Sequence, residues 1–125
     1  MKETVLAKTR QFEGFAAEWI AAWNAHSIDD IMSHYAEDVT VKSPFLETAV
    51  PGSGGTVTGK AKLREIYGKA FVKYPDLRFE LIRVLASTES VVLHYRSVEE
   101  LLAAETFMLN PSGKATLVLC HYSVA

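Results

Sequence analysis

Residues 77–124 read LRFELIRVLASTESVVLHYRSVEELLAAETFMLNPSGKATLVLCHYSV, and this stretch determines the fold. Apolar and β-branched residues alternate with polar ones in several runs, a pattern that predicts strands. Short polar turns separate the runs, and Asn110-Pro111-Ser112-Gly113 carries the strongest turn signal. The stretch therefore predicts one antiparallel meander of four strands, over Leu77–Ala86, Ser90–Val98, Ala104–Leu109 and Ala115–Val124.

The chain before this meander has helical periodicity in three places. From Thr4 to Ala25 the aromatic residues fall on one stripe, which predicts a long amphipathic helix. Ser27 is placed to cap a short second helix, with Asp30 at the capping-box spacing. A short strand is predicted at Val39–Ser43. A third helix is predicted over residues 58–74, where a proline ends it.

The stretch Leu46–Thr58 is rich in glycine, and we predict a mobile loop that borders the mouth of a pocket. The run from Gly54 to Lys60 has the spacing G-x-x-x-x-G-K of a phosphate-binding loop. The next residue is Ala61, where that motif requires Ser or Thr to hold Mg²⁺. The alternating strand and helix units of a nucleotide-hydrolysing domain are also missing, so we interpret the stretch as a rim loop.

Helices that precede an antiparallel sheet indicate an α+β fold. A chain of 125 residues fits one domain, which we expect to span residues 1–125. The net charge of −2 gives no basic surface for nucleic acid. The sequence lacks both the apolar run of a secretory signal and the roughly 20 apolar residues that span a bilayer. Cys120 is the single cysteine, which excludes an internal disulfide and predicts a cytoplasmic location.

Short motifs along nearly the whole chain resemble the nuclear transport factor 2-like superfamily, in its SnoaL-like and ketosteroid-isomerase-like branch. These motifs are Trp23-Asn24-Ala25-His26-Ser27-Ile28-Asp29, His34-Tyr35-Ala36-Glu37-Asp38-Val39, Ser43-Pro44-Phe45, Gly59-Lys60-Ala61-Lys62-Leu63-Arg64 and Pro75-Asp76-Leu77-Arg78-Phe79. The resemblance implies a cone, in which a curved antiparallel sheet wraps around the N-terminal helices (a cystatin-like α+β roll) and leaves a pocket at the open end. It implies no single function, because the superfamily includes enzymes, binding modules and transport factors.

The resemblance carries over only part of the ketosteroid isomerase chemistry. It places Ser43 at the position of the aspartate base, Trp19 at that of the oxyanion-hole tyrosine, and Glu105 at that of a second acid. A serine hydroxyl is not a base at neutral pH unaided, and an indole N–H donates a hydrogen bond but transfers no proton. Steroid isomerisation by that mechanism is therefore not expected, although the carboxyl at position 105 is kept.

The register of one hairpin decides which polar residues reach the pocket. A two-residue turn at Glu99-Glu100 would place His94 opposite Glu105 and Arg96 opposite Ala103. The resemblance puts Glu105 on the concave face, so His94 and Arg96 are predicted there as well. With His94 and Glu105 as the predicted catalytic pair, the predicted ligand-binding residues are Trp19, Tyr35, Ser43, Arg96, Phe107, Val118 and Tyr122.

Such a pocket fits two classes of function. The first is a cofactor-independent isomerase, cyclase or dehydratase that moves a proton on a small, largely apolar carbonyl compound. In that enzyme His94 is the acid or base and Glu105 orients it. Arg96 or Trp19 stabilises the developing negative charge. The second class is a module that binds a small apolar or amphipathic molecule without turnover.

The same polar residues also have structural interpretations. Arg96 and Glu105 can form a structural ion pair, and His94 can be a hydrogen-bonded core residue. No metal site is expected, because the four histidines lack the spacing of metal ligands. Serine-based acyl transfer is not expected either, because no nucleophile-elbow sequence surrounds Ser43.

The convex face of the predicted sheet is apolar. A contiguous apolar patch rarely stays in water on a monomer, so we expect a homodimer that packs through the sheet. In the predicted register this patch consists of Val91, Leu93, Tyr95, Met108, Leu117 and Leu119.

Overall fold

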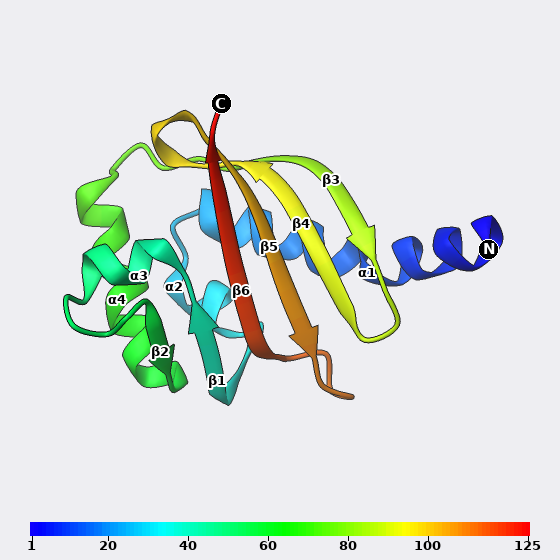
Figure 1. The fold of residues 1–125 in the computed structure, drawn as a ribbon, viewed down its shortest axis with the longest axis horizontal. Helices are drawn as coiled ribbons and strands as arrows, with labels where there is room; N and C mark the ends of the chain where they lie inside the picture. Colours follow the sequence, from blue (N-terminus) through cyan, green and yellow to red (C-terminus); the bar gives the residue numbers. More distant parts are fainter.

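A six-stranded sheet curves around one long helix in the computed structural model, which describes residues 1–125 (Figure 1). The helix α1 crosses the concave face of the sheet, and the shorter helices gather at one end of it. In chain order the elements are α1 (Lys2–Asn24), α2 (Ile28–Met32), β1 (Tyr35–Lys42), α3 (Pro44–Ala49), β2 (Thr56–Thr58), α4 (Lys60–Lys73), β3 (Glu80–Ala86), β4 (Ser90–Arg96), the 3-10 turn η1 (Val98–Glu100), β5 (Leu101–Leu109) and β6 (Ala115–Val124).

The predicted α+β cone is confirmed, with one difference in the sheet. The strand order is β2-β1-β6-β5-β4-β3, and four of the five pairings are antiparallel. Strand β1 instead runs parallel to β6, with Val41 opposite Val118, so the sheet is mixed. The pairing joins strands far apart in the sequence, which alternation within each strand cannot predict. None of the helices is long and apolar enough to cross a bilayer.

The predicted first helix is confirmed as α1, and its aromatic stripe lies in the core. Phe12, Ala16, Trp19 and Trp23 are each at most 5% exposed. Each indole removes a large apolar area from water, so the stripe fixes the helix against the sheet. The first turns of α1 carry no such stripe, remain exposed, and project beyond the edge of the sheet (Figure 1).

Side-chain hydrogen bonds fix the end of α1. Asn24 forms two bonds to the backbone of Phe79, donating to its carbonyl at 2.9 Å and accepting from its N–H at 2.7 Å. These bonds hold the tryptophans of α1 against the start of the third strand. Ser27 caps α2 as predicted, since its hydroxyl accepts the N–H of Asp30 at 3.3 Å.

Residues 46–58 are more regular than the predicted loop. They include most of α3 and the short strand β2. Ser43 caps α3 by accepting the N–H of Phe45 at 3.1 Å, and Pro44 takes the first helical position. Ser-Pro is a known helix-start signal, so α3 was readable from the sequence. The mobility of this segment stays a prediction.

The predicted register of the β4–β5 hairpin is wrong. The strands are joined by η1 rather than by a two-residue turn, and Glu99 and Glu100 adopt positive φ angles of 56° and 60°. Leu93 therefore lies opposite Glu105, and His94 lies opposite Ala104. A shift of one residue moves every side chain of a strand to the other face.

Candidate functional site

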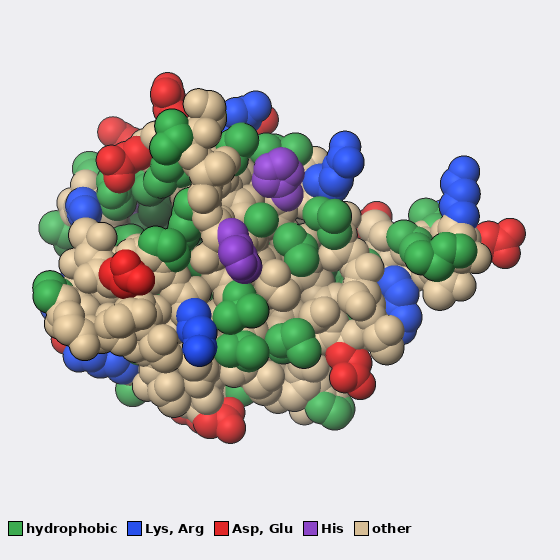
Figure 2. Space-filling model, viewed as in Figure 1, with side chains coloured by type: hydrophobic (Ala, Val, Ile, Leu, Met, Phe, Trp, Pro, Cys, Tyr) green, Lys and Arg blue, Asp and Glu red, His purple; other side chains and the backbone are tan.

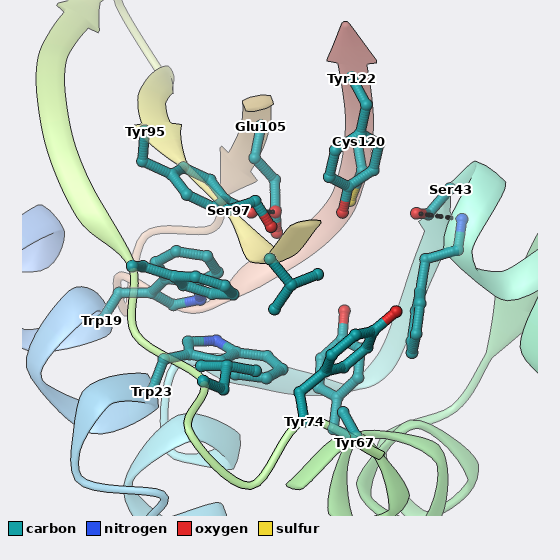
Figure 3. Close-up of a pocket in the computed structure, with 15 residues that line it drawn as sticks. Trp19, Trp23, Ser43, Tyr67, Tyr74, Tyr95, Ser97, Glu105, Cys120 and Tyr122 are labelled. Atoms are coloured by element: carbon teal, nitrogen blue, oxygen red, sulfur yellow. Dashed lines mark hydrogen bonds between the residues drawn. The ribbon is translucent and has the colours of Figure 1, made fainter. Parts of the chain in front are cut away.

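A small cavity lies between α1, the end of α4 and the concave face of β4, β5 and β6 (Figure 3). Its volume is about 50 Å³, and twelve of its fifteen lining residues are hydrophobic. Most of the wall is aromatic, because α1, α4 and the sheet each contribute rings; among these are Trp19, Trp23, Phe45, Tyr67, Tyr74 and Phe79. Polar groups on the sheet side come from Ser43, Tyr95, Ser97, Glu105 and Tyr122, and the hydroxyls of Tyr67 and Tyr74 lie on the α4 side.

Glu105 is the one carboxyl group in the cavity wall, and it is 3% exposed. The hydroxyl of Tyr95 donates to Oε1 of Glu105 at 2.7 Å, and Figure 3 shows the carboxyl end pointing into the space between Tyr95 and Tyr122. None of the ion pairs in the structure involves Glu105. Glu105 is therefore a buried acid without a cationic partner.

Burial raises the pKa of Glu105 from 4.5 to about 7, because an apolar surrounding disfavours the carboxylate. Hydrogen bonds from Tyr95 and Cys120 act in the opposite direction and lower this pKa. The two protonation states of Glu105 are therefore nearly balanced at neutral pH. That balance is the property that general acid–base catalysis requires.

The other titratable groups around Glu105 stay neutral. Burial raises the pKa of Tyr95, Tyr122 and Cys120, and the nearby Glu105 charge raises each of them further. A thiol with a raised pKa is a poor nucleophile, so Cys120 acts as a small wall residue. The two tyrosine hydroxyls remain protonated and can donate hydrogen bonds.

Ser43 joins α3 to the cavity. It is 7% exposed, and its oxygen already accepts the N–H of Phe45. The hydroxyl proton is not used in that bond, and the hydroxyl lies close enough to Cys120 and Tyr122 to lower the pKa of both. Ser43 can therefore donate a hydrogen bond at the polar side of the cavity.

Trp19 lines the cavity with its ring and not with its N–H. The indole nitrogen donates to the hydroxyl of Tyr35 at 3.0 Å, and both residues are 1% exposed. Tyr35 lies behind Trp19 and outside the cavity lining. The neighbouring Trp23 has the one buried side-chain polar atom without a hydrogen-bond partner, its indole nitrogen.

The structure does not bring His94 or Arg96 to the cavity. The corrected register places both residues on the convex face, where His94 is half-buried and Arg96 is exposed. The predicted His94–Glu105 pair is therefore wrong, and the alternative interpretation of Arg96 and Glu105 as a structural ion pair does not hold either. Phe107 and Val118 do lie on the concave side, but both are fully buried in the core and do not line the cavity.

Of the predicted site residues, the cavity brings together Trp19, Ser43, Glu105 and Tyr122. Sequence reasoning missed Tyr95, the direct partner of Glu105. The signal was present, because Leu93 and Tyr95 alternate with His94 and Arg96, which marks Leu93 and Tyr95 as the buried face. Nothing in the structure offers a metal site, since no three His, Cys, Asp or Glu side chains are grouped.

The SnoaL-like domain family matches residues 16–116, so the chain belongs to this family. A SnoaL-like protein of unknown function from Burkholderia thailandensis is 38% identical, with a TM-score of 0.85 over 94% of this chain and 95% of that one. No curated protein matches significantly.

Two more distant structures share the fold. A candidate ketosteroid isomerase from Kribbella flavida is 19% identical, with a TM-score of 0.69 over 94% of this chain and 82% of that one. A candidate polyketide cyclase from Sinorhizobium meliloti is 9% identical, with a TM-score of 0.73 over 90% of this chain and 98% of that one. At these identities the likeness concerns the fold alone. The SnoaL-like family match confirms the predicted SnoaL-like branch of the nuclear transport factor 2-like superfamily.

Proposed function

We propose that the cavity binds a small, largely apolar carbonyl compound, and that Glu105 moves a proton on it without a cofactor. The observation that carries the proposal is a buried carboxyl group, free of any cation, with a pKa of about 7 in an aromatic cavity. The names of two structural relatives, ketosteroid isomerase and polyketide cyclase, belong to the same broad class of carbonyl chemistry.

The ionised carboxylate of Glu105 takes a proton from the carbon next to the carbonyl group. The electron pair of that C–H bond moves toward the carbonyl oxygen and forms an enolate. Protonated Glu105 then returns the proton to the enolate, which restores the carboxylate. Where the compound has a β,γ double bond the anion is a dienolate, and return of the proton to the γ carbon moves the double bond and isomerises the compound. The hydrogen bond from Tyr95 holds Oε1, so the second carboxylate oxygen is left for the substrate.

The developing oxyanion needs hydrogen-bond donors inside the cavity. Tyr122 and Ser43 are the donors proposed for this role, because both line the cavity and both keep a hydroxyl proton available. Trp19 is not proposed, since its N–H is already bonded to Tyr35. Arg96 is not proposed either, because it lies on the convex face.

The proposal is tested by deuterium uptake into cyclopentanone in deuterium oxide, followed by NMR. We expect the wild-type protein to accelerate deuterium uptake at the carbon next to the carbonyl group. In Glu105→Gln this acceleration should be smaller by a factor of about 10²–10⁴. The rate should rise with pH through about 7, where Glu105 becomes ionised. Glu100→Gln is the control, because Glu100 is exposed and lies outside the cavity.

The second candidate function is a binding module with the same cavity and no turnover. One observation favours it: no second acid or base that titrates near neutral pH lines the cavity. The wild-type protein would then bind cyclopentanone but cause no more deuterium uptake than Glu105→Gln. That result would support the binding module and contradict the proposed enzyme.

We also infer that the convex face of the sheet joins two copies of the chain. Hydrophobic side chains and histidines gather over β4, β5 and β6 in Figure 2. Val91, Leu93 and Tyr95 do not belong to this patch, because they are buried on the concave side. The corrected patch consists of Leu85, Val92, Leu102, Met108, Leu117 and Leu119, of which Leu85 and Met108 are 49% and 38% exposed.

The cytoplasmic location stays a prediction.

A further inference from the structure

The cavity around Glu105 is too small for most ligands in its present state. Its volume of about 50 Å³ is well below the roughly 300–1,000 Å³ of typical ligand pockets. A second hollow of about 230 Å³ lies directly outside it and opens to solvent between α3, the end of α4 and η1. The two spaces share a wall made by Phe45, Tyr74, Ser97, Val98 and Tyr122.

One hydrogen bond crosses this wall from side to side. Tyr74 stands at the C-terminal end of α4, and its hydroxyl donates to Oε2 of Glu99 in η1 at 2.6 Å. This contact joins the end of the helix to the connection between β4 and β5. Val98 is the neighbour of Glu99 and lines both spaces, so the bond also fixes this apolar part of the wall.

The backbone of η1 is strained at the same place. Glu99 and Glu100 have φ angles of 56° and 60°, in the left-handed region that side chains disfavour. Two adjacent residues in this region persist only when other contacts hold them, and such strain is often found at switch segments. Glu100 forms no side-chain hydrogen bond, whereas Glu99 is held by Tyr74.

We propose that the Tyr74–Glu99 hydrogen bond is a latch, and that ligands reach Glu105 only after it breaks and Val98 moves away from Phe45. The inner and outer spaces then form one pocket. Phe45, Tyr74 and Val98 become the residues that decide which ligands enter. The latch concerns the cavity of the proposed function, but it is a statement about access and stands whether or not Glu105 transfers a proton.

Tryptophan fluorescence measures this access directly. The chain has two tryptophans, Trp19 and Trp23, and both line the inner cavity while being at most 5% exposed. Acrylamide is a small neutral quencher that reaches them when the latch opens. Quenching requires neither substrate nor turnover, so its result is independent of the proposed reaction.

We expect Tyr74→Phe and Glu99→Gln each to increase the acrylamide quenching constant by about two- to tenfold, the range that matches the loss of one hydrogen bond. The double variant should behave like either single variant, because both remove the same contact. Glu100→Gln is the matched control, since it lies in the same turn without a contact to Tyr74, and it should quench like the wild type.

Tyr74→Phe removes one hydroxyl at a half-buried position, and circular dichroism would verify that each variant is folded. Quenching constants equal to wild type in both single variants would overturn the latch. Equal increases in Glu99→Gln and Glu100→Gln would also overturn it, because the effect would then belong to the charge of the turn.

Discussion

Tyr95 and Glu105 lie on the neighbouring strands β4 and β5, and the tyrosine hydroxyl donates a 2.7 Å hydrogen bond to the carboxyl group inside the cavity. The bond stabilises the carboxylate, while burial among aromatic rings disfavours it. Burial is the larger effect, so the pKa of Glu105 is about 7. The chemistry proposed for the protein depends on this balance.

Replacing Tyr95 should change that balance in a known direction. Tyr95→Phe removes the hydrogen bond that lowers the pKa of Glu105, so this pKa should rise above 7 by about one unit, the effect of losing one bond to a charged group. Carbon NMR of labelled glutamate measures it. His94→Gln should leave the pKa of Glu105 unchanged, because His94 lies on the other face of the sheet. A change in the Glu105 pKa in the His94→Gln variant would contradict the observed register.

Stability should depend on pH through the same residue. The pKa of Glu105 is raised in the folded state, so the folded protein binds a proton that the unfolded chain releases between pH 4.5 and about 7. The associated stability is present at low pH and is lost as the pH rises through about 7. A rise from 4.5 to about 7 corresponds to about 3 kcal/mol of unfolding free energy.

Glu105→Gln removes this titration and should therefore flatten the pH dependence. Relative to wild type, the variant should gain up to about 3 kcal/mol of unfolding free energy between about pH 5 and pH 9. Urea unfolding at several pH values measures the difference. Parallel curves for the two proteins across this range would mean that Glu105 has an ordinary pKa in the folded state.

Charge on the convex face should separate the proposed dimer. Leu119→Glu places a carboxylate within the patch, so the dimer dissociation constant should increase about tenfold or more. Sedimentation equilibrium measures it. Val72→Glu is the control, because Val72 is 83% exposed on α4, away from the sheet. A wild-type chain that sediments as a monomer at micromolar concentration would rule out the dimer.

The segment Leu46–Thr58 should open more readily than the centre of the sheet. It holds only the short elements α3 and β2, whereas β6 is paired on both sides. Its amide hydrogens should exchange on the order of 100-fold faster than those of β6. Hydrogen exchange followed by mass spectrometry compares the two segments directly. Equally slow exchange would mean that the segment is part of the rigid core.

Local patterns in the sequence predicted most of the elements. The stripe of α1 was readable because two indole rings and their neighbours recur at helical spacing. The turn after β5 was readable because Asn110 has a local role, accepting the backbone N–H groups of Ser112 and Lys114. The alternation of β6 agrees with the structure as well, because Val118 and Tyr122, both predicted to bind ligand, lie on the concave side.

The predicted site failed where one turn decided the outcome. Glutamate rarely adopts positive φ, so nothing in Glu99-Glu100 predicted two such residues in succession. The resulting register exchanged the faces of His94 and Tyr95. The alternation of apolar residues in β4 was the more reliable guide to the buried face. Burying a tyrosine ring is energetically more favourable than burying an unpaired charge.

The central claim is that Glu105 is a buried acid that titrates near neutral pH, and carbon NMR of the labelled Glu105 carboxyl tests it most directly. We predict a titration midpoint of about 7 in the wild-type protein, with the signal assigned by its loss in Glu105→Gln. A midpoint near 4.5, the ordinary value, would contradict the claim and the proton transfer built on it.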